Sequence, residues 1–327
     1  MEHSRSLAVA IALSALVTAD MPFLQAQDYP SRAVTIVVPF AAGGSTDTIG
    51  RVIAQKLTDQ IGKPFVVENK GGAGSMIGAT AVSKAVPDGY TLLLATNAAM
   101  ALNPTLSKNP PFDAEKDFVP LALVAQGAFF LIANPSLPLR SVADLISLAK
   151  EKPKFISFAS SGVGSVPHIF MEMFTGMTKI ELTHVPYRGS APAMTDVIAG
   201  HVSVMFTDPA LGVEVAKSGK ARVLGVSSVS RHASALQIEP ISQAVPGYDA
   251  VSWIAIVAPA KTPSAIVRRL QAELRAVIEQ PDFKRQLGGH GFDLMEISGD
   301  EAMQGFVKSE IERWRLVLLQ AGLAGSQ

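Results

Sequence analysis

The chain has 327 residues, of which 48% are hydrophobic and 17% are charged, and this length suits two domains with real hydrophobic cores. Its 28 Lys and Arg residues balance 28 Asp and Glu residues. No basic excess is therefore available to neutralise a phosphate backbone, and we expect no nucleic-acid partner. Cysteine is absent, which excludes disulfides, thiolate metal sites and a thiol nucleophile.

Residues 1–26 have the pattern of a cleaved secretory signal. Arg5 gives a weakly positive start, an uncharged apolar run covers residues 7–18, and Ala26 places a small residue before the expected cleavage point. The run is short for a membrane span, which needs about 20 apolar residues, although a retained N-terminal anchor is the alternative. No later segment has the length and hydropathy of a transmembrane helix. The sequence therefore predicts a soluble, exported protein, located in the periplasm of a Gram-negative cell.

Short apolar strands alternate with helical patterns after residue 26. Residues 33–40 form a β-branched apolar run typical of a strand buried on both faces, and a glycine turn follows it. Ser45 or Thr46 can then cap a helix whose apolar residues recur at helical spacing. The same order of strand, turn and helix recurs, with strands expected at residues 65–68, 91–95, 155–159, 181–185 and 202–207. The chain is predicted to be an α/β protein with two mostly parallel sheets flanked by helices.

No Pro/Gly-rich linker divides the chain, which favours domains connected by strands that cross between them. Candidates for the crossing strands are residues 121–133 and 251–258. Residues 27–125 and 251–327 would then form a discontinuous domain 1, and residues 126–250 would form domain 2. Such a layout predicts a cleft between the domains with the crossing strands as its hinge.

Three glycine-rich turns each follow an expected strand and precede a helical pattern: residues 39–47, 69–75 and 160–165. Free backbone N–H groups and the positive end of the helix dipole make such a turn an anion site. A tight turn with a helix cap is the alternative for each of them, and no phosphate-binding or dinucleotide fingerprint is present. Because α/β sheets bind ligands at the carboxyl ends of their strands, the three turns together predict a site for a small anion.

The sequence offers no catalytic site that we can identify. The Gly-x-Ser-x-Gly pattern of a strained nucleophilic serine is absent. His168 and Glu172 are four residues apart, but no second histidine lies at zinc-ligand spacing, and a contact on the helix surface is the expected role. We therefore expect no enzymatic activity, no metal and no cofactor.

Residues that follow two further strands stay open between a binding role and a structural one. Tyr187 and Arg188 come after the strand that ends at residue 185, where Tyr187 could contact a ligand and Arg188 could hold a carboxylate or simply lie on the surface. Asp208 follows residues 205–207 and could accept a hydrogen bond from a ligand or cap the next helix.

Five segments together resemble the Bug-type proteins, which are the extracytoplasmic solute receptors of tripartite tricarboxylate transporters. They are residues 39–47, 66–74, 87–93 (Pro-Asp-Gly-Tyr-Thr-Leu-Leu), 185–189 (Val-Pro-Tyr-Arg-Gly) and 258–263. The resemblance covers nearly all of the chain after residue 26. It implies a two-domain periplasmic binding protein fold of the second type that closes over its ligand, and it implies the transporter's membrane subunits as partners.

The resemblance also implies where the ligand lies. In that family the loops that match the first two glycine turns hold a ligand carboxylate, largely through backbone amides and water, and the other domain supplies further contacts. Together with Tyr187, the expected binding residues are Phe40, Ala42, Gly43, Gly44, Ser45, Asp47, Asn69, Ala73, Gly74, Thr96, Asn97, Ser161, Gly164, Ser165 and Asp208.

The sequence thus predicts a periplasmic solute-binding protein for a tripartite tricarboxylate-type secondary transporter. Its ligand would be a di- or tricarboxylate, an acidic amino acid or an aromatic carboxylate, and a monomer is expected. One alternative is a sensor-only receptor that contacts the ectodomain of a sensor kinase in a two-component system. The other is an exported α/β hydrolase, which would need a nucleophile and a base in the cleft.

Overall fold

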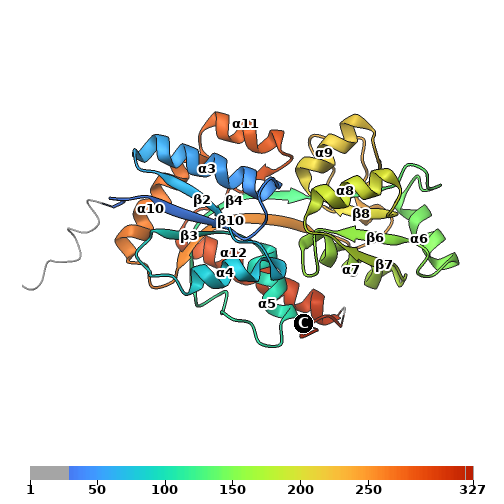
Figure 1. Cartoon of the computed structure of the whole chain (residues 1–327), viewed down its shortest axis with the longest axis horizontal. Coiled ribbons are helices and arrows are strands. Elements are labelled where there is room, and N and C mark those ends of the chain that lie inside the picture. The colour runs from blue at the N-terminus through green and yellow to red at the C-terminus, as the bar shows by residue number, and fades with distance from the viewer. Residues whose placement is uncertain (1–28, 321, 327) are drawn as a thin grey trace, which may run out of the picture.

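The computed structural model describes residues 29–320 and 322–326, and the predicted signal peptide at residues 1–26 lies outside them. The described chain forms two β-sheets that follow each other along the long axis of the molecule, each flanked by helices (Figure 1). We call the six-stranded sheet with its helices lobe 1 and the five-stranded sheet with its helices lobe 2. No helix in the described part has both the length and the apolar character needed to cross a membrane.

Lobe 1 is built from both ends of the described chain. Its strands are β1 (Val34–Val38), β2 (Phe65–Asn69), β3 (Thr91–Thr96), β4 (Phe118–Ala128), β10 (Val251–Pro259) and β11 (Asp293–Leu294). Its helices are α3 (Ser45–Ile61), the 3-10 turn η1 (Ala73–Ser75), α4 (Met76–Ser83), the π-helical η2 (Ala98–Leu102), α5 (Asn103–Leu106), α10 (Ser264–Ile278), α11 (Pro281–Gly289) and α12 (Asp300–Gln320). The strand order is β11-β4-β10-β3-β1-β2.

Lobe 2 is built from the middle of the chain. Its strands are β5 (Phe130–Ala133), β6 (Ser157–Ser160), β7 (Thr183–Pro186), β8 (Val204–Thr207) and β9 (Arg222–Val226). Its helices are α6 (Val142–Glu151), α7 (Val166–Thr178), α8 (Ser190–Ala199), α9 (Pro209–Ser218) and the 3-10 turn η3 (Ile241–Gln243). The strand order is β7-β6-β8-β5-β9.

The chain crosses between the lobes where the sequence predicts. β4 leads into β5 through Phe129, and the chain returns in β10, which pairs with β4 from Val251–Ala128 to Pro259–Phe118 (Figure 1). The predicted α/β fold with two sheets and crossing strands is thus confirmed.

Both sheets are mixed, which corrects the prediction of mostly parallel sheets. β1 is parallel to β2 and β3, and β6 is parallel to β7 and β8. In lobe 1, however, β10 is antiparallel to β3 and β4, and in lobe 2 β5 is antiparallel to β8 and β9. The physical reason is that one crossing strand leaves lobe 1 and the other returns to it, so the two run in opposite directions where they pair.

One hydrophobic core is shared between the lobes. Three further cores each belong to one lobe. Two of them cover the two faces of the lobe 1 sheet, and the other lies between the lobe 2 sheet and helices α8 and α9. The shared core joins α6 and α7 to η2, α5 and the C-terminal half of α12, and in it Trp314 stacks on Phe170 with ring centroids 5.5 Å apart. Met303 and Val307, nearer the start of α12, pack on the lobe 1 sheet. Helix α12 therefore contacts both lobes.

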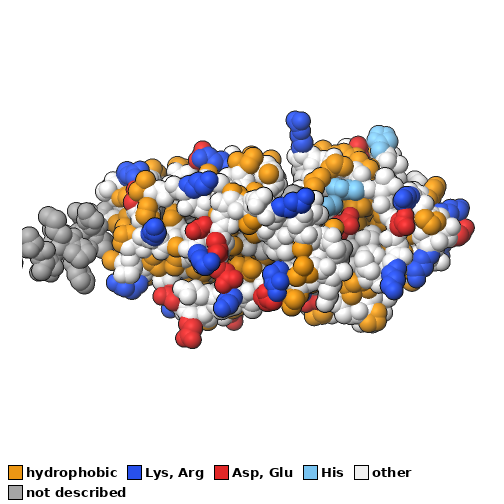
Figure 2. Space-filling view, turned by 90° about the horizontal axis from the view of Figure 1, so that it is seen from below, with side chains coloured by type: hydrophobic (Ala, Val, Ile, Leu, Met, Phe, Trp, Pro, Cys, Tyr) orange, Lys and Arg blue, Asp and Glu red, His pale blue; other side chains and the backbone are white. Residues whose placement is uncertain are grey.

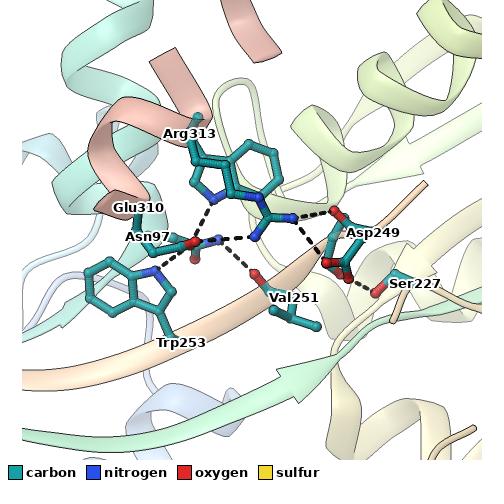
Figure 3. Close-up of polar contacts among 9 residues, drawn as sticks. Asn97, Ser227, Asp249, Val251, Trp253, Glu310 and Arg313 are labelled. Atoms are coloured by element: carbon teal, nitrogen blue, oxygen red, sulfur yellow. Dashed lines mark hydrogen bonds and ion pairs between the residues drawn. The ribbon is translucent and has the colours of Figure 1, made fainter. Parts of the chain in front are cut away.

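A buried carboxylate fixes α12 to the returning strand (Figure 3). Glu310 is 7% exposed and accepts N–H bonds from the indoles of Trp253 at 3.0 Å and Trp314 at 3.1 Å. Arg313 donates to the same carboxylate at 3.2 Å and to the backbone oxygen of Asp249 at 2.7 Å. Because a buried charge is tolerated only with such partners, the cluster holds α12 against the start of β10.

The surface carries charges of both signs. Figure 2 shows Lys and Arg side chains interspersed with Asp and Glu side chains over the face that it presents, in both lobes. This distribution follows from equal numbers of basic and acidic residues in the sequence. On this face, charges of neither sign gather into a broad patch.

Candidate functional site

The first glycine turn connects β1 to α3. Gly44 is the N-cap residue of α3, and no side chain caps this end of the helix. The N–H groups of its first turn therefore stay available to an anion at the positive end of the helix dipole. Gly43 has a φ of +89°, in the left-handed region that favours glycine. Ala42, Gly43 and Gly44 are exposed, whereas Phe40 and Ser45 are half-buried.

Asp47 shapes this turn from inside. It is 3% exposed, and its carboxylate accepts N–H bonds from the Gly43 backbone at 2.9 Å, Arg51 at 3.0 Å and Asn69 at 2.9 Å. Asn69 also donates to the backbone oxygen of Phe40 at 3.1 Å. Burial alone would raise the pKa of Asp47, but the bonds from Arg51, Gly43 and Asn69 hold it below its usual value. Asp47 and Asn69 bond each other and the turn backbone, so in this structure they position the first glycine turn, and their contact with a ligand stays a prediction.

The second glycine turn leads from β2 through η1 to α4. Ala73, Gly74 and Ser75 have successive φ values of +46°, +61° and +85°. A non-glycine residue in this region costs about 1–3 kcal/mol and tends to lie at a functional site. Ser75 is 2% exposed, and its hydroxyl has no hydrogen-bond partner among the described residues.

The third glycine turn connects β6 to α7 in lobe 2. Gly162 and Gly164 have φ values of +127° and +75°. Ser165 is the N-cap residue of α7, but its hydroxyl donates to the backbone oxygen of Gly162 at 2.6 Å and does not cap the helix. The start of α7 is thus uncapped by side chains, as is the start of α3. Ser161 is half-buried within the turn.

The first turn contacts lobe 2 directly. The Ser45 hydroxyl donates a hydrogen bond to the Asp208 carboxylate. Asp208 also accepts from the backbone N–H of Leu211 at 3.3 Å and so caps α9, which is one of its two predicted roles. Two predicted binding residues from different lobes are therefore brought together.

Asn103, which the sequence analysis missed, joins the other two turns. It is 2% exposed, and its Nδ2 lies within hydrogen-bond distance of the backbone oxygens of Gly74 at 2.6 Å, Gly164 at 2.9 Å and Ala98 at 3.0 Å, which its two hydrogens share. Gly74 belongs to the second turn and Gly164 to the third, so one side chain links the lobes. A polar carboxamide within the mostly apolar run of residues 98–106 is the feature of the sequence that could have indicated this role.

The end of β3 lies against the crossing strand β10. The fully buried Asn97 donates to the backbone oxygen of Val251 at 3.3 Å (Figure 3) and accepts from the Ser252 hydroxyl at 2.9 Å. Asn97 therefore holds the crossing strand β10, and its contact with a ligand stays a prediction. The hydroxyls of Thr96 and of Thr207, at the end of β8, are buried without a hydrogen-bond partner in the described chain. Because such groups need water or a ligand, Thr96 remains a candidate contact and Thr207 is a further one.

Tyr187 is held within lobe 2. Its hydroxyl donates to Asp196 on α8 at 2.6 Å, and burial together with this bond raises the pKa of Tyr187 to about 12. The hydroxyl proton is thus unavailable to a ligand. Arg188 is exposed and forms no ion pair with any described residue.

A serine and a histidine meet behind the third turn, but their surroundings favour a structural role. Ser160 Oγ lies 2.7 Å from His184 Nε2, yet Ser160 is fully buried and also bonds the backbone oxygen of Gly162 at 3.1 Å. No carboxylate among the described residues bonds His184. His168 stacks on His184 with ring centroids 4.2 Å apart, and burial together with that neighbour lowers the pKa of His168 to about 4. The described residues also contain no group of three or more His, Asp and Glu side chains placed to hold a metal ion.

Comparisons with known proteins agree with this architecture. The family model described as "Tripartite tricarboxylate transporter family receptor" matches residues 49–323. Protein BugT of Bordetella pertussis is 32% identical over 301 residues, which are 91% of this chain and 92% of that protein. The structure of R. palustris Rpa4515 with adipate has a TM-score of 0.85 and 35% identity, covering 91% of this chain and 99% of that one. MatC from Rhodopseudomonas palustris with bound malate has a TM-score of 0.83 and 29% identity, covering 89% of this chain and all of that one.

Proposed function

Since this chain belongs to the tripartite tricarboxylate transporter receptor family, we propose that it captures a small carboxylate between its lobes and delivers it to the membrane subunits of such a transporter. The observation that carries the proposal is that glycine turns of the two lobes lie together: Asn69 of the second turn bonds the first turn at Phe40, Asn103 links the second turn to the third, and Ser45 of the first turn bonds Asp208 of lobe 2. The helices that follow the first and third turns have no side-chain cap. Their free amides suit a carboxylate without a dedicated basic side chain.

For the ligand we infer a short dicarboxylate. Adipate and malate are the ligands named for the two similar R. palustris proteins, and both are small dicarboxylates. One carboxylate would accept hydrogen bonds from the free amides of the first two turns, with Ala42, Gly44 and Ala73 as contacts, while the Gly43 amide stays bonded to Asp47 and shapes the turn. The other end of the ligand would lie against lobe 2, near Ser161. A pocket held by backbone groups on both sides discriminates by length and charge.

Binding would close the lobes. We propose that residues 27–125 and 251–327 move as one body against residues 126–250, with β4 and β10 as the hinge. The crossing strands are the direct backbone connections between the two sheets, which supports this division. Contacts of the ligand with both lobes would supply the preference for the closed form, because a ligand that binds both forms equally shifts nothing.

Delivery to a transporter requires export. We propose that residues 1–26 are removed and that the mature protein acts as a monomer in the periplasm. Mass spectrometry of the periplasmic fraction should find an N-terminus at Gln27, and an intact Met1 in the membrane fraction would show a retained anchor. Loss of uptake of labelled ligand on deleting the gene would separate a transport role from a sensing role.

Thermal-shift measurements on residues 27–327 test ligand capture. Adipate, malate, citrate, aspartate and benzoate form the panel, with uncharged 1,6-hexanediol as the control matched to adipate in length. A ligand at about 100 times its dissociation constant adds about 2.7 kcal/mol of stability, which is readily measured. The proposal fails if no carboxylate stabilises the protein or if hexanediol does so equally.

A further inference from the structure

Asn103 is placed to bind both lobes with one amide. Its two N–H hydrogens are shared among three backbone oxygens, and the contacts with Ala98 and Gly74 stay within lobe 1. The third contact goes to the backbone oxygen of Gly164, which lies in lobe 2 and 61 residues further along the chain. The side chain is thus anchored in lobe 1 and already oriented to meet the third turn.

The glycines on either side leave the space that Asn103 occupies. A Cβ atom on Gly74 would lie 2.5 Å from Asn103 Oδ1, and one on Gly164 would lie 2.3 Å from the same atom. Both distances are too short for any side chain, and both glycines also have left-handed φ values. The approach of the second and third turns therefore depends on these two glycines and on the side chain between them.

We propose that Asn103 is a latch: it holds the second and third glycine turns together in the closed receptor and thereby sets how long the ligand stays bound. The inference rests on the proposed function, because it assumes that the lobes close around a ligand. Rotation of lobe 2 would carry the Gly164 oxygen away, while the two bonds within lobe 1 persist. The third bond therefore exists only in the closed form, and only such a difference can shift the equilibrium between the forms.

Asn103→Asp is the informative variant, since it has the same shape and replaces the N–H donors with an oxygen that faces carbonyl oxygens. We expect at least tenfold weaker binding of adipate, which corresponds to about 1.4 kcal/mol. Because the ligand can leave only when the lobes open and the latch breaks, the dissociation rate should carry the change and the association rate should stay within about twofold. A residue that merely supports the fold would not produce this division between the two rates.

Thr105→Ala is the matched control, because it removes a hydrogen bond to Ala101 within the same region without touching lobe 2. Closure is followed by the distance between spin labels on cysteines introduced at Gln55 on α3 and Lys217 on α9. Both positions are exposed, and the chain has no native cysteine. Circular dichroism establishes that each variant is folded.

We expect Asn103→Asp to have a smaller closed population than wild type, with and without saturating adipate, and Thr105→Ala to match wild type. Equal closed populations and equal dissociation rates in wild type and Asn103→Asp would overturn the latch. If wild type does not respond to adipate, the ligand assignment fails, and the ligand-free distance distributions still decide the role of Asn103. In that comparison a smaller closed share in Asn103→Asp supports the latch, and identical distributions refute it.

Discussion

Replacing Asp47 with alanine removes the buried carboxylate that holds the first glycine turn. The turn backbone and Asn69 each lose a hydrogen bond to an ionised acceptor, at 2.9 Å in both cases. Such bonds contribute about 1.5–3 kcal/mol each, while the bond from Arg51, whose side chain is 53% exposed, adds less than about 1 kcal/mol. Water can reach the exposed Gly43 amide, so the lower figures apply. The expected loss of unfolding free energy is about 3 kcal/mol.

The loss should depend on pH in a definite direction. Because the pKa of Asp47 is lower in the folded protein than its ordinary value, its contribution is fully present above the unfolded-state pKa of about 3.9. The contribution declines as the pH falls through the folded-state pKa. The difference in stability between wild type and Asp47→Ala should therefore be constant from about pH 5 to pH 7 and shrink below about pH 4.

Urea unfolding followed by circular dichroism measures the loss, and titration calorimetry with adipate measures the effect on the site. Asp59→Ala on the same helix is the control, since Asp59 is exposed and accepts a bond only from Gln55. That variant should lose at most about 0.5 kcal/mol and bind adipate normally. If Asp47→Ala were no less stable than Asp59→Ala, water would replace the carboxylate and the positioning role would be refuted.

Three further variants test other parts of the site and fold. Gly43→Val should abolish adipate binding in calorimetry, because valine would force the turn out of its left-handed φ of +89°. No atom lies within 4 Å of the added Cβ, so the effect would come from the backbone alone. Retained binding would show that the turn tolerates this strain. Arg188→Ala should leave the dissociation constant within about twofold, because the site relies on backbone amides; a large loss would assign the ligand charge to Arg188. Gly50→Ala places a Cβ 3.0 Å from Val38 and 3.1 Å from Leu94. It should lower the free energy of unfolding in urea by about 1–3 kcal/mol. An unchanged unfolding midpoint would mean that the neighbouring side chains move to accommodate the added methyl group.

Local sequence signals predicted the parts of the site that are local in the chain. The strand at residues 33–40, its glycine turn and the helix that follows form a single unit, and the structure contains it as β1 and α3. The three glycine turns were visible for the same reason, because turn geometry is set by a few consecutive residues. The crossing strands were also located, since they are long apolar runs.

Contacts that depend on distant partners could not be read from the sequence. Nothing near Asn97 indicates that its amide would bond β10, which lies 154 residues further on. Asn103 joins turns that are separated by 90 residues, and neither of its glycine neighbours carries a side chain that could signal the contact. The mixed sheets could not be predicted for the same reason, because the direction of a crossing strand is decided by the lobe to which the chain returns.

The carboxylate of Glu310 is shared by two indoles, which gives the intrinsic tryptophan fluorescence of the protein a defined location. The sequence has two tryptophans, and the indoles of both end on this one group, between the returning strand and the helix that contacts both lobes. Both indoles therefore lie where β10 and α12 meet, and loss of a hydrogen bond to Glu310 is expected to change their emission. With the lobe rotation proposed above, we expect the tryptophan emission of the unlabelled protein to change when adipate binds.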